Sequence, residues 1–169
     1  MPDVRSKRVC VVSHCHLNAN TKVHGLADHA GTDEVLVTRL VFEGSGIVQL
    51  PCPEATYLGV KRWTMTYEQY DTPAFRRHCR RLLRPVLDTL VALTADGCRI
   101  EAVYGVDGSP CCGVTDTSRG FEGGDITRLS AAGDLPRSGH STGRGVFMEE
   151  FEAMLSEAGI TAKFSESSS

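Results

Sequence analysis

The sequence predicts one α/β domain of three layers, in which helices cover both faces of a mostly parallel sheet in a flavodoxin-like or Rossmann-like arrangement. The chain has 169 residues, enough to bury one core, and 41% of them are hydrophobic, as in ordinary globular proteins. Predicted strands and helices alternate along the chain, which is the pattern of a parallel sheet with helices on its faces. We expect the domain to span residues 1–164 and a polar, flexible tail to occupy 165–169.

The first half of the chain supplies two strands and a helix. A β-branched run over 8–13 predicts a buried strand, and polar turns follow it. Acidic residues followed by apolar residues at helical spacing predict a helix over 33–43. A second short strand over 46–50 is expected to end at Pro51 and Pro53, because proline lacks the N–H that a strand ladder needs.

The second half of the chain begins with the longest helical pattern, over 72–96, where apolar residues form a stripe at helical spacing. Pro85 lies inside this pattern, and we expect it to kink the helix or to split it in two. The remaining elements are expected in this order: a strand at 99–105, a glycine-rich loop region at 105–145, a helix at 146–158 and an edge strand at 160–164.

Composition and charge argue against several classes of protein. The net charge is -3 with both signs scattered, and no nucleic-acid-binding module is recognisable. No apolar run approaches the roughly 20 residues that cross a bilayer, and the first residues lack the features of a secretory signal. We therefore expect a cytoplasmic protein with neither nucleic-acid nor membrane partners. The basic cluster at 76–81 is interpreted as a solvated helix face, with contact to an anionic substrate as the alternative.

The seven cysteines are many for a chain of the reducing cytoplasm, where excess cysteine points to metal binding or catalysis. Three of them have apolar neighbours or lie in a helical pattern and are predicted to be buried, inert thiols: Cys10, Cys79 and Cys98. Cys15, Cys52 and Cys112 instead follow the three predicted strands. Because the carboxyl ends of parallel strands share one edge, these three thiols are expected to meet in one pocket.

The three thiols favour a bound cation, because neighbouring thiolates repel one another. A zinc ion would take a fourth ligand such as His14, His16 or His140, or a water. A [4Fe-4S] cubane usually takes four cysteines, and with three of them one iron is left open to act as a Lewis acid. The cysteine spacings of 37 and then 60 residues do not separate the two metals. Unconnected small apolar side chains in loop turns are the structural alternative.

Four segments carry a resemblance to a known family: Val-Ser-His-Cys-His-Leu-Asn at Cys15, Leu-Pro-Cys-Pro-Glu at Cys52 with Leu58-Gly59 and Arg62 beyond it, Gly-Ser-Pro-Cys-Cys-Gly at Cys112, and Gly143-Arg-Gly-Val146. Together they resemble the bacterial 2-thiouracil desulfidase family over nearly the whole chain. In that family three cysteines hold a [4Fe-4S] cluster whose fourth iron binds sulfur, and by motif these fall on Cys15, Cys52 and Cys112.

The chain departs from the family pattern at three places. Cys111 stands where the family usually has serine, and Lys22-Val-His-Gly25 replaces the usual first loop. The Val106-Asp107 region stands where a lysine commonly precedes the Ser-Pro motif. Since the last two places are expected to touch substrate, the chain is identified as a divergent, desulfidase-related branch.

The resemblance implies a redox-neutral desulfidase that removes sulfur from a thiouracil-like thiocarbonyl compound as hydrosulfide. Such a hydrolysis needs one group to activate water and one to protonate the leaving or ring atom. Glu54 is the first candidate for this chemistry, and Asp107 and Ser109 are second candidates; each could instead stabilise a turn. The expected partner is a small thiolated molecule, and a homodimer is left open. A zinc-binding hydrolase and a non-catalytic iron–sulfur or sulfur carrier are the rival functions.

Further side chains are candidates for the walls of the pocket. If strand geometry persists beyond residue 13, His14 and His16 point to opposite sides, and one of them could face the pocket. The segment 119–145 is rich in Gly, Ser and Arg and is a candidate lid. Three aromatic residues could form a wall against a flat heterocycle, with simple packing as the alternative: Trp63, Tyr67 and Tyr70.

Overall fold

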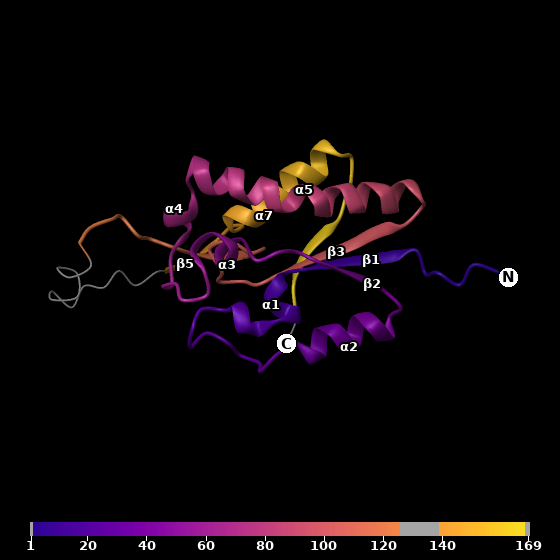
Figure 1. The fold of residues 1–169 in the computed structure, drawn as a ribbon, viewed down its shortest axis with the longest axis horizontal. Helices are drawn as coiled ribbons and strands as arrows, with labels where there is room; N and C mark the ends of the chain where they lie inside the picture. Colours follow the sequence, from indigo (N-terminus) through magenta and orange to yellow (C-terminus); the bar gives the residue numbers. More distant parts are fainter. Residues whose placement is uncertain (1, 126–138, 168–169) are drawn as a thin grey trace.

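The computed structural model describes residues 2–125 and 139–167, which form a four-stranded sheet flanked by helices and a separate two-stranded hairpin (Figure 1). This arrangement confirms the predicted α/β, three-layer fold class. The elements in chain order are β1 (Arg8–Val12), α1 (His14–Leu17), the 3-10 helix η1 (Ala19–Thr21), α2 (Glu34–Phe42), β2 (Gly46–Gln49), α3 (Pro53–Leu58), α4 (Tyr67–Tyr70), α5 (Pro73–Ala95), β3 (Arg99–Gly105), β4 (Asp116–Arg119), β5 (Gly139–Thr142), α7 (Val146–Glu157) and β6 (Lys163–Glu166).

The main sheet has the strand order β2-β1-β3-β6, and every neighbouring pair is parallel. At the middle of the sheet, Val11 of β1 is opposite Val48 of β2 on one side and Val103 of β3 on the other. Because these three strands run in one direction, their carboxyl ends lie at the same edge of the sheet. In Figure 1 that edge faces away from the N-terminus, toward α3, α4 and the hairpin.

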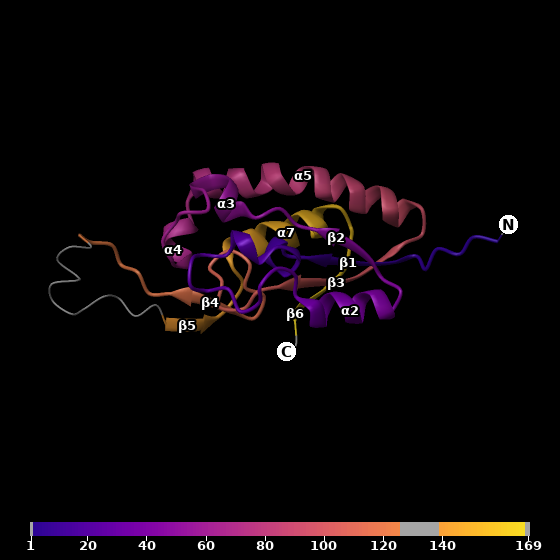
Figure 2. The same ribbon diagram turned by 60° about the horizontal axis from the view of Figure 1, so that its bottom comes forward.

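The two faces of the sheet are covered by different helices, with α5 and α7 on one face and α2 on the other (Figure 2). Alternate residues of β1 serve the two faces, as the pleat of a strand requires. Val11 belongs to the core cluster that contains Phe151 of α7, whereas Val12 packs in a second cluster with Leu36 and Leu40 of α2. The sheet is therefore buried on both faces, which explains why its strands are apolar in the sequence.

Helix α5 runs unbroken for 23 residues, so of the two outcomes predicted at Pro85, a kink or a split, the split is wrong. The helix begins where predicted, with the Thr72 side chain accepting a hydrogen bond from the Phe75 amide at 3.2 Å. Pro85 is exposed to solvent, whereas Leu83 and Leu87 on either side of it are buried in the core. Packing of the flanking leucines holds the helix together across the position where proline removes a backbone donor.

The basic cluster on α5 joins this helix to α7, which corrects its interpretation as a solvated face. Arg76 places Nη1 2.8 Å from a carboxylate oxygen of Glu150, and Arg80 places Nε 2.6 Å from the other oxygen. Arg76 also pairs with Glu149 at 2.7 Å, and Arg80 pairs with Glu157 at 3.0 Å. Two of the clustered arginines are thus committed to neighbouring carboxylates of the same chain.

Two further expectations need correction. The last strand lies at 163–166 rather than 160–164, and it includes Ser165 and Glu166 of the expected tail. The region expected to be mostly loop contains the antiparallel hairpin of β4 and β5, while residues 126–138 of the expected lid lie outside the described residues. Within the described ranges, no helix combines the length and the apolar character that crossing a membrane requires.

Candidate functional site

The structure brings Cys15, Cys52 and Cys112 together at the carboxyl edge of the sheet, where all three line one cavity of about 440 Å³. Each follows a different strand of the parallel set: Cys15 follows β1, Cys52 follows β2 and Cys112 follows β3. The predicted acid–base candidates Glu54, Asp107 and Ser109 line the same cavity. All six residues singled out in the sequence are therefore neighbours, while their roles stay predictions.

Local structure fixes each cysteine differently. Cys15 lies in α1, which begins directly after β1. Cys52 is the N-cap of α3, where its Sγ accepts a hydrogen bond from the Ala55 amide at 3.4 Å and Pro53 occupies the first helical position. Cys112 lies in a tight turn in which the Ser109 hydroxyl accepts a hydrogen bond from the Cys112 amide at 3.0 Å. The sequence predicted a strand end at the prolines but missed the short helices α1 and α3.

Burial raises the pKa of all three thiols. It raises the pKa of Cys15 to about 11, with Lys22 opposing the shift, and it raises the pKa of Cys52 against the hydrogen bond from the Ala55 amide. For Cys112, burial and then the nearby Cys15 and Cys52 thiols raise the pKa well above its ordinary value. A cation bound among these sulfurs would reverse the shifts, because metal binding displaces the thiol protons.

Within the described parts of the chain, no group of three or more His, Cys, Asp or Glu side chains is placed to hold a single metal ion. His14 and His16, two of the residues considered as a fourth zinc ligand, are absent from the lining of the cysteine cavity. The strand ends at Val12, so the expected alternation of the two histidines does not occur. His16 is buried with Nδ1 3.0 Å from Asp33 and Nε2 2.9 Å from the Gly105 carbonyl.

Glu54 forms a buried ion pair with Arg62, whose Nε lies 2.8 Å from Oε2 of the carboxylate. Arg62 also donates to the carbonyl oxygens of Thr21 at 2.9 Å and Gly59 at 3.3 Å, so it links η1 to α3 at the cavity. Burial alone would lower the pKa of Arg62, but the hydrogen bond and the charge of Glu54 outweigh it and raise the pKa. The carboxylate of Glu54 is thus held rigidly beside Cys52.

Cys111 and Tyr70 form the inner surroundings of Glu54. Both side chains are buried in the main core cluster. Burial and the charge of Glu54 raise the pKa of each of them. The Tyr70 hydroxyl has no hydrogen-bond partner among the described residues.

Asp107 and Ser109 act on the backbone of the Cys112 loop. Asp107 Oδ1 accepts hydrogen bonds from the amides of Val114 at 2.8 Å and Thr115 at 2.9 Å, and the Thr115 hydroxyl donates to Oδ2. Burial alone would raise the pKa of Asp107, but these hydrogen bonds outweigh it and lower the pKa. Because both carboxylate oxygens are engaged, the turn-stabilising interpretation suits Asp107 better than catalysis. Ser109 holds the turn in the same manner.

The aromatic wall expected from the sequence is not formed. Trp63 is 81% exposed, whereas Tyr67 and Tyr70 are buried, and none of the three lines the cavity. The apolar part of the wall is aliphatic instead, and its residues are Val23, Leu26, Met65, Val106 and Pro110. The cavity is therefore lined by both polar and apolar groups.

Lys22 of the loop expected to touch substrate lines the cavity, whereas sequence reasoning gave Arg62 no role there and considered His140 for zinc alone. Lys22 places Nζ 2.5 Å from Asp28, and Arg62 pairs with Glu54. His140, considered only as a zinc ligand, arrives on β5. No periodicity in the sequence indicates the hairpin, because β4 and β5 are polar and short.

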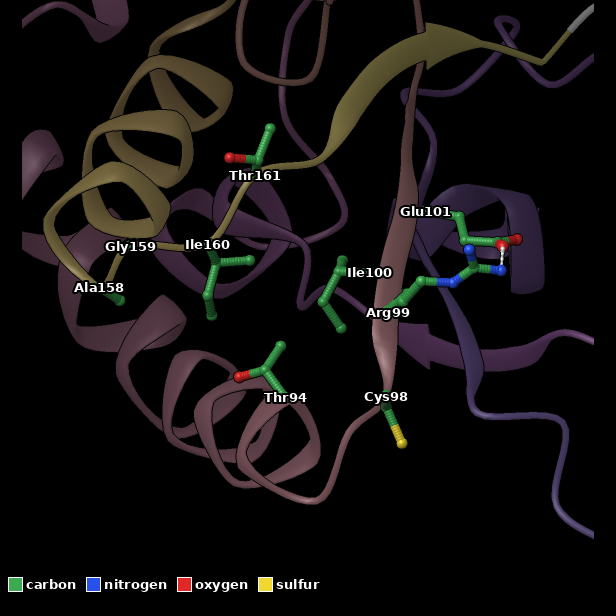
Figure 3. Close-up of a pocket in the computed structure, with 9 residues that line it drawn as sticks. All are labelled: Thr94, Cys98, Arg99, Ile100, Glu101, Ala158, Gly159, Ile160 and Thr161. Carbon is green, nitrogen blue, oxygen red and sulfur yellow. Dashed lines mark hydrogen bonds and ion pairs between the residues drawn. The ribbon is translucent and has the colours of Figure 1, made fainter.

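The three cysteines predicted to be inert do not line this cavity. Cys10 and Cys79 are buried as predicted, and Cys98 is half-buried. Cys98 lines another cavity of about 410 Å³ between the start of β3 and the end of α7, together with Thr94 and Ile160 (Figure 3). This cavity contains none of the predicted site residues.

Comparison with known proteins gives one relative in sequence and one in structure. No family model matches the chain. The chain is 37% identical over 111 residues to the uncharacterized protein MJ0003 of Methanocaldococcus jannaschii, a match covering 66% of this chain and 70% of that protein. The relative comes from an archaeon, and the comparisons do not support the bacterial setting of the resemblance.

A similar solved structure is that of TudS, a [4Fe-4S]-dependent thiouracil desulfidase. The match has a TM-score of 0.53 and 18% sequence identity, and it covers 93% of this chain and 90% of that one. At this identity the likeness shows a shared fold, a distant relation that agrees with the resemblance seen in the sequence.

Proposed function

We propose that this chain, which belongs to the same protein family as MJ0003 of Methanocaldococcus jannaschii, is an iron–sulfur-dependent desulfidase acting on a small thiocarbonyl compound. The observation that carries the proposal is the meeting of Cys15, Cys52 and Cys112 in one cavity. The fold shared with a thiouracil desulfidase supports it. The three thiols are free and form no disulfide. Together they make a set of donors suited to a metal cluster.

The donor set fits a cluster in its chemistry. Iron–sulfur clusters are held by cysteine thiolates, and the buried thiols of this cavity would lose their protons on binding. Cys15, Cys52 and Cys112 would hold a [4Fe-4S] cluster, and Ser109 would keep the Cys112 turn in place through its hydrogen bonds to the backbone. When bound through three cysteines, the cluster supplies a Lewis-acidic iron that can polarise the carbon–sulfur bond of a substrate.

The protein supplies orientation and proton transfer. The aliphatic part of the cavity wall packs against the apolar face of a heterocycle and limits access of water. Glu54, held by Arg62, lies beside Cys52, and its carboxylate relays a proton from the attacking water to the departing sulfur or the ring nitrogen. The sum of the reaction is a thiocarbonyl and water giving a carbonyl and hydrogen sulfide, with no change of oxidation state.

The test is anaerobic purification and reconstitution with iron and sulfide, followed by metal and sulfide analysis. We expect about four irons and four sulfides per chain, as one cubane contains, and release of sulfide from 2-thiouracil, 2-thiouridine or a related thioamide. One zinc per chain without sulfide would support a zinc hydrolase instead. A loaded cluster that releases no sulfide from any of these compounds would support a carrier.

A pair of cysteine variants tests the ligand assignment. Cys112→Ser is expected to lose iron, because its side chain lines the cavity. Cys79→Ser is the matched control, because Cys79 is buried in the helical core and lies outside the cavity lining. Equal iron content in both variants would contradict the assignment of Cys112 as a ligand.

A further inference from the structure

A carboxylate–histidine pair lies at the cavity, on the two strands of the hairpin. His140 of β5 places Nδ1 2.5 Å from Oδ2 of Asp116 of β4. A carboxylate accepts hydrogen bonds, so Nδ1 donates, and in the neutral imidazole the other ring nitrogen, Nε2, then carries the lone pair. Among the residues that the structure describes, no hydrogen bond engages Nε2 of His140. The ring lines the same cavity as the three cysteines and Glu54.

Hydrogen bonds join the hairpin to the loop that carries Cys112. These bonds fix the position of His140 relative to the cavity. The Gly108 amide donates to the Asp116 carbonyl at 3.1 Å, and the Ser118 hydroxyl donates to the Gly108 carbonyl at 2.8 Å. The Thr117 hydroxyl donates to the carbonyl of Ser109 at 3.1 Å. These bonds join β4 to the Cys112 loop along its length.

Gly108 makes room for the imidazole. A Cβ atom at this position would lie 2.7 Å from Cε1 of His140, closer than real side-chain contacts allow. Gly108 also has a φ of +79°, a conformation that glycine adopts without strain. The ring of His140 therefore lies directly against the backbone of the Cys112 loop.

We infer that His140 is a catalytic base of this cavity and that Asp116 is the residue that positions it, an inference that rests on the proposed desulfuration. Glu54 is poorly suited to serve both proton transfers, because its Oε2 is bound by the buried Arg62. His140 is 63% exposed in its side chain and stands where water reaches the cavity. The two residues thus divide the two proton transfers that hydrolysis of a thiocarbonyl needs.

The atoms balance without an oxidant or a reductant. The oxygen of water forms a bond to the thiocarbonyl carbon, and Nε2 of His140 takes the proton that this water releases. The carbon–sulfur bond then breaks as the carbonyl forms, and sulfur leaves as hydrosulfide. The Glu54 carboxylate takes the remaining hydroxyl proton of the addition product as the carbonyl forms and passes it to the departing sulfur, and the imidazolium returns its proton to solvent.

The experiment compares His140→Gln and Asp116→Asn with the wild-type chain, each loaded with iron and sulfide in the same way. His140→Gln is expected to lower kcat for sulfide release from 2-thiouracil, or from whichever tested thioamide the wild type uses, by about 100-fold or more. Asp116→Asn should lower kcat less, and Asp116→Glu should restore part of the loss. KM, iron content and the visible spectrum should stay near the wild-type values in all three.

Asp88→Asn is the matched control, since Asp88 forms an exposed pair with Arg84 on the outer face of α5. A readout that needs no turnover is ¹⁵N NMR of histidine-labelled chain, in which His140 should carry its proton on Nδ1, and Asp116→Asn should shift this preference. Full kcat in His140→Gln, or a proton on Nε2 in the wild type, would overturn the inference and leave the desulfuration standing. A loaded wild type that releases no sulfide would overturn the proposed function, and the role of His140 with it.

Discussion

Replacing Arg62 by methionine removes one member of a buried ion pair and leaves the other member in place. The side chains of Arg62 and Glu54 are only 5% and 11% exposed, so water does little to screen the charge that remains. The same substitution removes the hydrogen bonds to the carbonyl oxygens of Thr21 and Gly59. We therefore expect Arg62→Met to be among the most destabilising single changes near the cavity.

The size of the effect follows from the burial. Removing one partner of a buried pair costs about 3–5 kcal/mol, a large part of the roughly 5–15 kcal/mol that stabilises a typical domain. With an m-value of about 2 kcal/mol per molar urea, the unfolding midpoint should fall by roughly 1.5–2.5 M. Adding Glu54→Gln to Arg62→Met should recover part of the loss, because the uncompensated carboxylate is then neutral, and the coupling energy should be roughly 0.5–3 kcal/mol.

The assay is urea unfolding followed by circular dichroism, with all variants at equal iron content. Arg84→Met is the matched control: its pair with Asp88 is 70% and 61% exposed, and such surface pairs contribute about 0–1 kcal/mol. A midpoint for Arg62→Met within the range of the Arg84→Met control would refute the argument from burial. Strictly additive effects of the Arg62 and Glu54 substitutions would show that the two side chains do not interact in solution.

Three other predictions concern stability. Asp107→Asn should cost roughly 1–3 kcal/mol of stability at pH 7. Because the folded-state pKa of Asp107 is lowered, this loss should be complete above the unfolded pKa of about 4 and should disappear as the pH falls through the folded-state pKa. Urea unfolding of both chains at pH 7 and pH 3 measures the change. Gly145→Ala should prevent normal folding, because its Cβ would lie 2.3 Å from the carbonyl carbon of Cys111. In the control Gly31→Ala the added Cβ meets open space, so the thermal midpoint should stay nearly unchanged. Equal thermal midpoints for the two variants would contradict the close contact at Gly145. Phe151→Ala should cost about 3–5 kcal/mol in urea unfolding, since the ring is fully buried in the main core, and a loss under 1 kcal/mol would argue against that packing.

The elements with long periodic patterns could be predicted from the sequence, because the spacing of their apolar residues indicates which face is buried. The strands β1 and β3 and the helices α2, α5 and α7 all lie where the pattern indicates. Short elements carry too few residues to show a period. Pro53, for example, ends a strand pattern and also begins α3, and only the second role is visible in the structure.

Tertiary contacts overrule local preference at other positions. The exposed Pro85 does not divide α5, because core residues on both sides of it hold the helix against its neighbours. The polar strands of the hairpin show no alternation of apolar residues. Hydrogen bonds to Gly108 and Ser109 in the preceding loop hold β4 in place. Neither effect leaves a signal in a window of neighbouring residues.

The convergence of the three cysteines was predictable for a topological reason that the other cavity residues do not share. β2, β1 and β3 are adjacent and parallel, so any residue just beyond their carboxyl ends is delivered to one edge whatever the strand order. Arg62 and His140 reach the cavity by long loops and by the hairpin, and their positions depend on contacts such as that of Arg62 with the Thr21 carbonyl. A distant relative can therefore keep the cysteines while its wall changes, so the identity of the substrate should depend on wall residues such as Lys22, Met65 and His140 rather than on the cysteines.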